Sequence, residues 1–156
     1  AKVAIADVPD RPGEAALVLQ AVAGAGINVD TITQNQSVSD DTTAITFTLP
    51  QADLEKARLA LEGVRDQIGF SKILTDENVG KVSIVGVGMR TTPGVAATFF
   101  RALAEAGVNI QIISTSEIRI SVVVASDDVD KAVRAAHSAF GLDGSDAAVV
   151  YAGTGR

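Results

Sequence analysis

Asp10-Arg11-Pro12-Gly13 decides the fold of this chain, because Thr91-Thr92-Pro93-Gly94 repeats its Pro-Gly end 81 residues later. At the same shift, Ala25-Gly26-Ile27-Asn28-Val29 corresponds to Ala106-Gly107-Val108-Asn109-Ile110. Apolar residues between the two signatures repeat as well, since Val18, Leu19 and Val22 correspond to Phe99, Phe100 and Leu103. A fixed internal period determines the architecture before any other feature does. This period is too long for a solenoid and suits a small domain, so the sequence predicts a tandem pair.

Each half has the same predicted order of elements, βαββαβ, which is the ferredoxin-like α+β pattern. In the first half, alternating and apolar runs predict strands over residues 2–8, 28–36, 42–49 and 68–74. One helix is predicted to begin at Pro12-Gly13. The other is predicted from an apolar stripe at helical spacing, formed by Leu54, Ala57, Leu61 and Val64.

The second half repeats this order, with strands predicted over residues 82–87, 109–114, 118–125 and 147–152. Its helices are predicted after Pro93-Gly94 and along the stripe from Val129 to Phe140. We assign residues 1–78 to the first domain and 79–156 to the second. The sequence does not fix which sheet the fourth and the last strands join, so strand exchange between the halves stays open.

The composition excludes several classes of partner. A net charge of −6 and a pI near 4.6 argue against nucleic acid, whose binding needs clustered Lys and Arg. The chain has no cysteine, and therefore no thiol ligand, disulfide or thiol nucleophile. Its apolar runs fall far short of the roughly 20 residues that a membrane span needs. The N-terminus also lacks the pattern of a signal peptide. We expect a soluble cytoplasmic protein with no nucleic-acid or membrane partner.

The usual motifs of catalysis, cofactor binding and metal binding are weak here. Gly86-Val87-Gly88 lacks the third glycine of a dinucleotide fingerprint, since Thr stands at position 91. The only histidine, His137, stands in a predicted helix and is best explained as a surface or helix-end residue. Asp127, Asp128 and Asp130 suit a helix start and lack the spacing of a calcium loop. We expect no catalytic residues, no cofactor and no metal.

The repeated Pro-Gly loops are the candidate binding sites. A helix N-terminus offers unpaired N–H groups and partial positive charge, which suit a carboxylate, and Gly13 and Gly94 leave that backbone accessible. A plain turn would explain either loop alone, but repetition at one offset favours a site. We expect the loop and the start of the second strand to share one end of the sheet. Asn28 and Asn109 would then face these loops in their own unit or in a partner. The alternative role for each asparagine is a left-handed turn residue.

An α-amino acid fits such a place, because it needs N–H donors for its carboxylate and oxygen acceptors for its ammonium. Asp10 and the amide oxygen of Gln34 can serve the ammonium or a side-chain hydroxyl. The second half has Thr91 in place of Asp10 and Thr115 in place of Gln34. The two sites are therefore chemically unequal: either they bind different ligands, or only the first binds strongly.

At these residues the chain resembles the ACT domain, a small-molecule sensing module of amino-acid metabolism. The tandem resembles the C-terminal regulatory region of aspartate kinase, of the actinobacterial type. The resemblance covers the whole chain and is most specific at Ser114-Thr115-Ser116-Glu117-Ile118-Arg119-Ile120-Ser121. Segments 10–16, 34–35, 80–86 and 149–156 support it. The Lys-containing Gly-Gly-Thr loop of the kinase domain is not among these residues. The resemblance implies a non-catalytic regulatory (β) subunit of an α₂β₂ aspartate kinase, an ATP-dependent phosphotransferase to aspartate.

The resemblance also implies feedback inhibition by threonine, often together with lysine, in the biosynthesis of lysine, threonine and methionine. Effector sites of the family form where one unit packs on another across a dimer. Carried over by position, the threonine site would use Asp10, Gly13, Ala15 and Gln34, with Asn109 and Ile110 from the facing unit. The second site would use Pro93, Gly94, Ser114, Thr115 and Ser116, facing Asn28 and Val29.

One residue departs from this pattern, since Gln36 stands where actinobacterial members carry a small apolar residue. Two other functions stay open. The first is an ACT-domain interaction protein that regulates another enzyme, for example acetohydroxyacid synthase, against which the run 114–121 argues. The second is a small enzyme, for which only His137 and scattered carboxylates are available.

Overall fold

Two four-stranded sheets contain the strands of the structure, a computed structural model that describes residues 1–86, 93–141 and 149–154. The chain divides into two compact units, Ala1–Glu77 and Asn78–Thr154. Each sheet is antiparallel, with the order β2-β3-β1-β4 in the first unit and β6-β7-β5-β8 in the second. The predicted ferredoxin-like fold is confirmed in both halves. Each sheet takes its described strands from its own half, so these strands are not exchanged.

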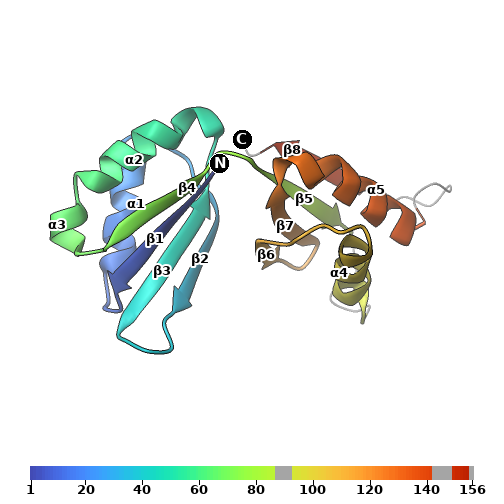
Figure 1. Ribbon diagram of the computed structural model, residues 1–156, viewed down its shortest axis with the longest axis horizontal. Coiled ribbons are helices and arrows are strands. Elements are labelled where there is room, and N and C mark those ends of the chain that lie inside the picture. The colour runs from blue at the N-terminus through green and yellow to red at the C-terminus, as the bar shows by residue number, and fades with distance from the viewer. Residues whose placement is uncertain (87–92, 142–148, 155–156) are drawn as a thin grey trace. The chain divides into compact units, whose positions relative to one another are not determined.

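The first unit places its helices on one face of its sheet (Figure 1). The core beneath them forms because every second residue of the central strands points to that face. Val3 and Ile5 of β1 and Ile45 and Phe47 of β3 are almost completely buried there. The elements are β1 (Lys2–Pro9), α1 (Glu14–Gly24), β2 (Asp30–Gln36), β3 (Thr42–Thr48), a 3₁₀ turn (Gln51–Asp53), α2 (Leu54–Glu62), α3 (Arg65–Ile68) and β4 (Lys72–Asp76).

The second unit builds a separate core from equivalent positions. Phe99 and Leu103 of α4 are fully buried, as are Val18 and Val22 of α1, which stand 81 residues earlier. The predicted repeat of the apolar stripe is thus a repeat of packing. The elements are β5 (Val79–Val85), α4 (Val95–Glu105), β6 (Ile112–Thr115), β7 (Arg119–Ala125), a 3₁₀ turn (Ser126–Asp128), α5 (Val129–Ala139) and β8 (Val149–Thr154). None of the helices in the described ranges is long and apolar enough to cross a membrane.

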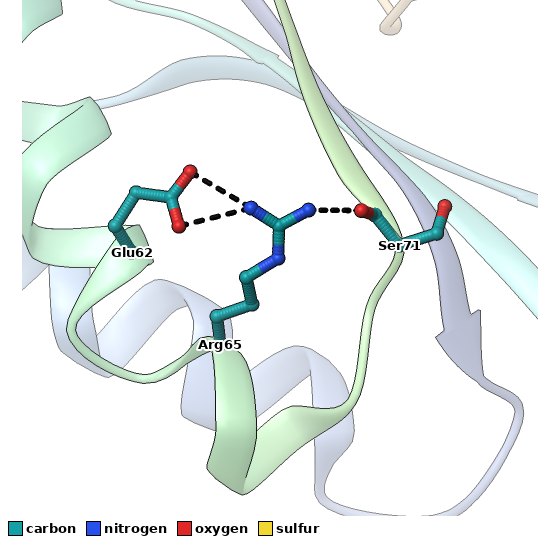
Figure 2. A network of polar contacts seen from close by, with 3 residues as sticks. All are labelled: Glu62, Arg65 and Ser71. Carbon is teal, nitrogen blue, oxygen red and sulfur yellow. Dashed lines mark hydrogen bonds and ion pairs between the residues drawn. The ribbon is translucent and has the colours of Figure 1, made fainter.

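The prediction of a strand over residues 68–74 is wrong at its start. Ile68 ends the short helix α3, Gly69 follows with φ 89°, and β4 begins only at Lys72. Arg65 braces this corner, as Figure 2 shows. Its Nη1 lies 3.0 Å from both carboxylate oxygens of Glu62, and its Nη2 donates a hydrogen bond to the carbonyl of Ser71. The apolar residues at 68, 70, 73 and 74 look like one strand in the sequence. In the structure Ile68 ends α3, Phe70 lies between the two elements, and Ile73 and Leu74 belong to β4.

Adjacent phenylalanines in α4 provide a test of the second core. Phe99 has no exposed surface, whereas Phe100 packs only partly against the same cluster. We expect Phe99→Ala to lower the free energy of unfolding of this unit by about 3–5 kcal/mol, because it leaves a cavity. Phe100→Ala, the matched control, should cost clearly less. Urea denaturation followed by fluorescence of the single tyrosine, Tyr151, measures both. Equal losses would contradict the assigned packing.

Candidate functional site

The two Pro-Gly loops have the same backbone geometry. Gly13 and Gly94 precede α1 and α4 in the left-handed region, with φ of 94° and 87°. The first backbone hydrogen bond of α1 runs from the N–H of Leu17 to the carbonyl of Gly13 at 3.1 Å. Its counterpart in α4 runs from Thr98 to Gly94 at 2.9 Å. The sequence repeat is therefore a repeat of two helix starts.

Both helix N-termini are open. Neither N-cap glycine can provide a side-chain cap, and no side-chain hydrogen bond from the described residues caps either helix. In α1 the amides of Ala15 and Ala16 precede the first helical hydrogen bond, as do those of Ala96 and Ala97 in α4. A Cβ added to Gly13 would meet no described atom within 4 Å. Such a terminus combines free N–H donors with partial positive charge, which suits an anionic group.

The pairing of β2 with β3 brings two glutamines toward the first loop. Gln34 pairs with Ile45 and Gln36 with Thr43, and residues that pair directly share a face of the sheet. Ile45 belongs to the core, so both glutamines lie on the face that carries the helices. Gln34 Nε2 lies 3.4 Å from Thr43 Oγ1, which is a long contact. Gln36 Nε2 donates a hydrogen bond of 2.7 Å to Asp10 Oδ2.

Backbone irregularities set this register. The pairing of β1 with β3 shifts between Ile5 and Val8, and Asp7 there has φ 59°. The pairing of β2 with β3 shifts between Asp30 and Thr33, and Thr31 there has φ 49°. Such bulges turn the side chains beyond them to a new direction. They decide on which face the ends of β1 and β2 present their polar groups.

Charged groups surround the first loop. Arg11 Nη2 contacts Glu14 Oε1 at 2.8 Å, and Glu14 occupies the first turn of α1, where a carboxylate is favoured. The other oxygen, Glu14 Oε2, is buried and has no hydrogen-bond partner among the described residues. On the β2–β3 turn, a hydrogen bond from the Thr42 side chain lowers the pKa of Asp40. That turn also holds the loop, because the N–H of Asp10 donates to the carbonyl of Asp41 at 2.8 Å.

The structure brings together the predicted residues of the first site that belong to the first unit. Asp10 and Gly13 are exposed in the loop, Ala15 is half-buried at the start of α1, and Gln34 is exposed on β2. In the second unit, Pro93 and Gly94 are exposed before α4, and Ser114, Thr115 and Ser116 are exposed at the end of β6. In the second unit only Thr115 lies on the face that carries the helices, because it pairs with the core residue Ile120, whereas Ser114 pairs with Ser121, which is outside that core. Thr91 lies outside the described residues.

The expected position of the asparagines within a unit is wrong. Thr42 pairs with the last residue of β1, next to the loop, whereas Thr48 pairs with the first residues of β1 and β2. The start of β2 is thus at the opposite end of the sheet from the Pro-Gly loop. Asn28 and Asn109 precede β2 and β6 as exposed residues, and Val29 and Ile110 pack partly on the cores. The reason is that the first helix of each unit, α1 or α4, runs from the Pro-Gly loop back to the other end of the sheet, where the second strand then begins.

Gln36 was not predicted to contact Asp10. In the sequence it differs from the family pattern, and nothing more was expected of it. Its spacing of two from Gln34 was the available signal, because residues i and i+2 of a strand share a face. The loop contact itself depends on the bulge in β1, which the sequence does not reveal.

Comparison with known proteins identifies the family of the chain. The ACT domain family matches residues 4–64 and 82–140, one repeat in each unit. The chain belongs to the ACT-domain family. It is 55% identical, over its whole length, to an aspartokinase from Mycolicibacterium smegmatis, of which it spans 37%. The ACT repeats account for both units, and no kinase domain lies within these 156 residues.

Solved structures extend the likeness to regulatory subunits. A crystal structure of aspartokinase alpha and beta subunits matches with a TM-score of 0.83 and 45% identity, covering 90% of this chain and 91% of that one. The ligand-free regulatory subunit of aspartate kinase from Thermus thermophilus matches with a TM-score of 0.82 and 41% identity, covering 89% and 91%. The ACT pair therefore corresponds to the regulatory part of aspartokinase, as the resemblance predicted.

The left-handed glycine gives a prediction with an internal control. Gly13→Ala should lower the free energy of unfolding by about 1–2 kcal/mol, the cost of a left-handed L-residue. Gly24→Ala, at the other end of α1 where φ is not positive, should raise it by about 0.4–1 kcal/mol. A Cβ meets no described neighbour at either position, so conformation alone separates the two. Urea denaturation followed by circular dichroism measures both, and shifts of the same sign would refute the assignment.

Proposed function

We propose that this chain is the regulatory part of an aspartate kinase and binds threonine as a feedback effector. The support is the open N-terminus of α1, with Asp10 in the loop before it and Gln34 on the sheet face that carries the helices, in a chain whose relatives are aspartokinases. The ligand carboxylate would accept hydrogen bonds from the amides at the helix start. Its ammonium would contact Asp10, and its hydroxyl would contact the Gln34 amide.

A small hydroxylated amino acid suits this half-site better than a long one. Ala15 at the start of α1 is half-buried against the core. Its small side chain would leave room for a ligand next to the helix start. Within the described ranges the Gln34 amide has only a long contact to Thr43, so it can turn toward a hydroxyl. We place the rest of the site on a facing ACT unit, where the resemblance assigns Asn109 and Ile110.

The second half-site would bind an effector with different chemistry. Gly94 supplies the same open helix start, but Ser114, Thr115 and Ser116 supply only hydroxyl groups and backbone. Without a carboxylate at that position, the ligand ammonium would have weaker partners there. We propose threonine or lysine for this site, with Asn28 and Val29 of a facing unit completing it.

Regulation would work through a shift between two packings of a dimer. Effector held by two facing units favours the packing in which both contact it, and an attached catalytic subunit would respond to that packing. An effector moves this equilibrium only by its difference in affinity for the two states. The edge strands support a dimer, since Ile32 on β2 is 49% exposed and Ile113, 81 residues later on β6, is 48% exposed.

Titration calorimetry with threonine tests the proposed effector. We expect saturable binding by the chain, reduced about tenfold or more by Asp10→Ala, because a hydrogen bond to a charged group is lost. Ala15→Thr should abolish binding, because its larger side chain would fill the ligand space. Asp66→Ala, an exposed carboxylate on α3, is the matched control and should bind as the unaltered chain does. Lysine, isoleucine and valine are titrated in parallel. A response only to a branched-chain amino acid would replace this proposal with regulation of acetohydroxyacid synthase.

The dimer gives a separate prediction. Ile32→Lys should weaken self-association more than about tenfold, because it places a charge where an apolar side chain would be buried. Val38→Lys, in the fully exposed turn after β2, is the control and should leave the association unchanged. Sedimentation velocity over a range of protein concentrations measures both. A chain that stays monomeric at every concentration, with and without threonine, would refute the dimer.

A further inference from the structure

The hydrogen bond between Gln36 and Asp10 occupies the group to which we assigned the effector's ammonium. Gln36 is the last residue of β2, and Asp10 is the first residue after β1. The two are 26 positions apart and are joined by a 2.7 Å contact from Nε2 to Oδ2. The contact is exposed, so a ligand can reach it and replace it.

The fold holds both residues in place through β3. Gln36 pairs with Thr43, and the next residue, Ser37, donates its N–H to the carbonyl of Thr42 at 2.9 Å. The N–H of Asp10 donates to the carbonyl of Asp41 at 2.8 Å, on the same turn. Both side chains therefore project from backbone tied to the start of one strand. The sheet therefore holds the backbone of both residues near each other.

A primary amide imitates an ammonium at a carboxylate. Both are N–H donors, and a bond to an ionised acceptor is stronger than one between neutral groups. The ammonium carries a full charge and can displace the neutral amide, which returns to water. Gln34 has no such bond to a carboxylate, because its amide makes only the long contact to Thr43 among the residues that the structure describes.

We propose that Gln36 is an internal competitor for Asp10, which lowers the affinity of the first site for its amino-acid effector. The inference rests on the proposed function, since it concerns the same site. In the free chain the Gln36 amide holds Oδ2, and the effector's ammonium would compete with it for that oxygen. Gln36 therefore sets the effector concentration at which the site fills.

Substitution of Gln36 should shift affinity in opposite directions. Gln36→Leu keeps the approximate size of the side chain and removes the donor, so threonine should bind about three- to tenfold more tightly, the effect of one exposed charge-assisted hydrogen bond. Gln36→Lys replaces the amide with a permanent cation, so threonine should bind at least about threefold more weakly. Asn35→Leu, on the adjacent position of β2 that pairs with Ala44, is the matched control and should leave the affinity unchanged.

A double-mutant cycle shows whether the effect passes through Asp10. Threonine is titrated by calorimetry into the unaltered chain, Gln36→Leu, Asp10→Asn and the double variant. We expect the gain from Gln36→Leu to vanish when Asp10 is replaced, because there is no carboxylate left to release. A gain that persists in the Asp10→Asn background overturns the inference.

The outcomes separate this inference from the proposed function. If the unaltered chain binds threonine and Gln36→Leu binds it equally or more weakly, the inference fails alone. If neither chain binds threonine, both the inference and the proposed function fail. Binding by Gln36→Leu with none detectable in the unaltered chain would support both.

Discussion

The left-handed glycine between a strand and its first helix is the constraint on which each unit depends. Gly13 directly precedes α1, and Gly94 directly precedes α4. Both adopt a left-handed conformation that costs an L-residue about 1–2 kcal/mol. The direction of the helix then follows, and with it the burial of residues such as Val18 and Phe99. Because no side chain caps the helix, the same turn leaves amides open. Fold and binding surface thus share one backbone conformation.

Two units with one backbone need not have one chemistry. The first unit sets a carboxylate, Asp10, and two glutamines of β2 beside its helix start, whereas the second offers hydroxyl groups at the end of β6. The backbone amides supply a general anion site in both. What distinguishes ligands is the acceptor set for the ammonium and the side chain. If the two units bind amino acids as proposed, duplication preserves the part of recognition common to all amino acids and lets the other part diverge.

The repeat and the order of the main elements could be predicted from the sequence, because the apolar periodicity and the Pro-Gly pairs indicate them directly. The sheet that the fourth and the last strands join could not, and it needed the strand pairings. The four-residue helix α3 could not, since its apolar residues continue into β4 without a change of pattern. The bulges at Asp7 and Thr31 are also hidden, because neither residue type demands positive φ. They set the register at the strand ends, so the contact of Gln36 with Asp10 needed coordinates. The sequence therefore indicated which kinds of residue lie near the site, but not which of them contact one another.

Glycine at the N-cap explains how a binding site can coexist with a stable helix. Serine, threonine or aspartate caps a helix from an extended conformation and would then close the site, whereas the left-handed φ of Gly13 and Gly94 disfavours these L-residues. The free chain therefore tolerates open amides that water satisfies. Asp10 also has a neutral partner in the free chain, because its Oδ2 accepts a hydrogen bond from the Gln36 amide. A charged donor would replace that amide. The carboxylate of an amino acid would then replace water at the helix amides, and its ammonium would replace the Gln36 amide at Asp10. That exchange is a difference in free energy between the free and bound packings, which a regulatory ligand requires in order to shift an equilibrium.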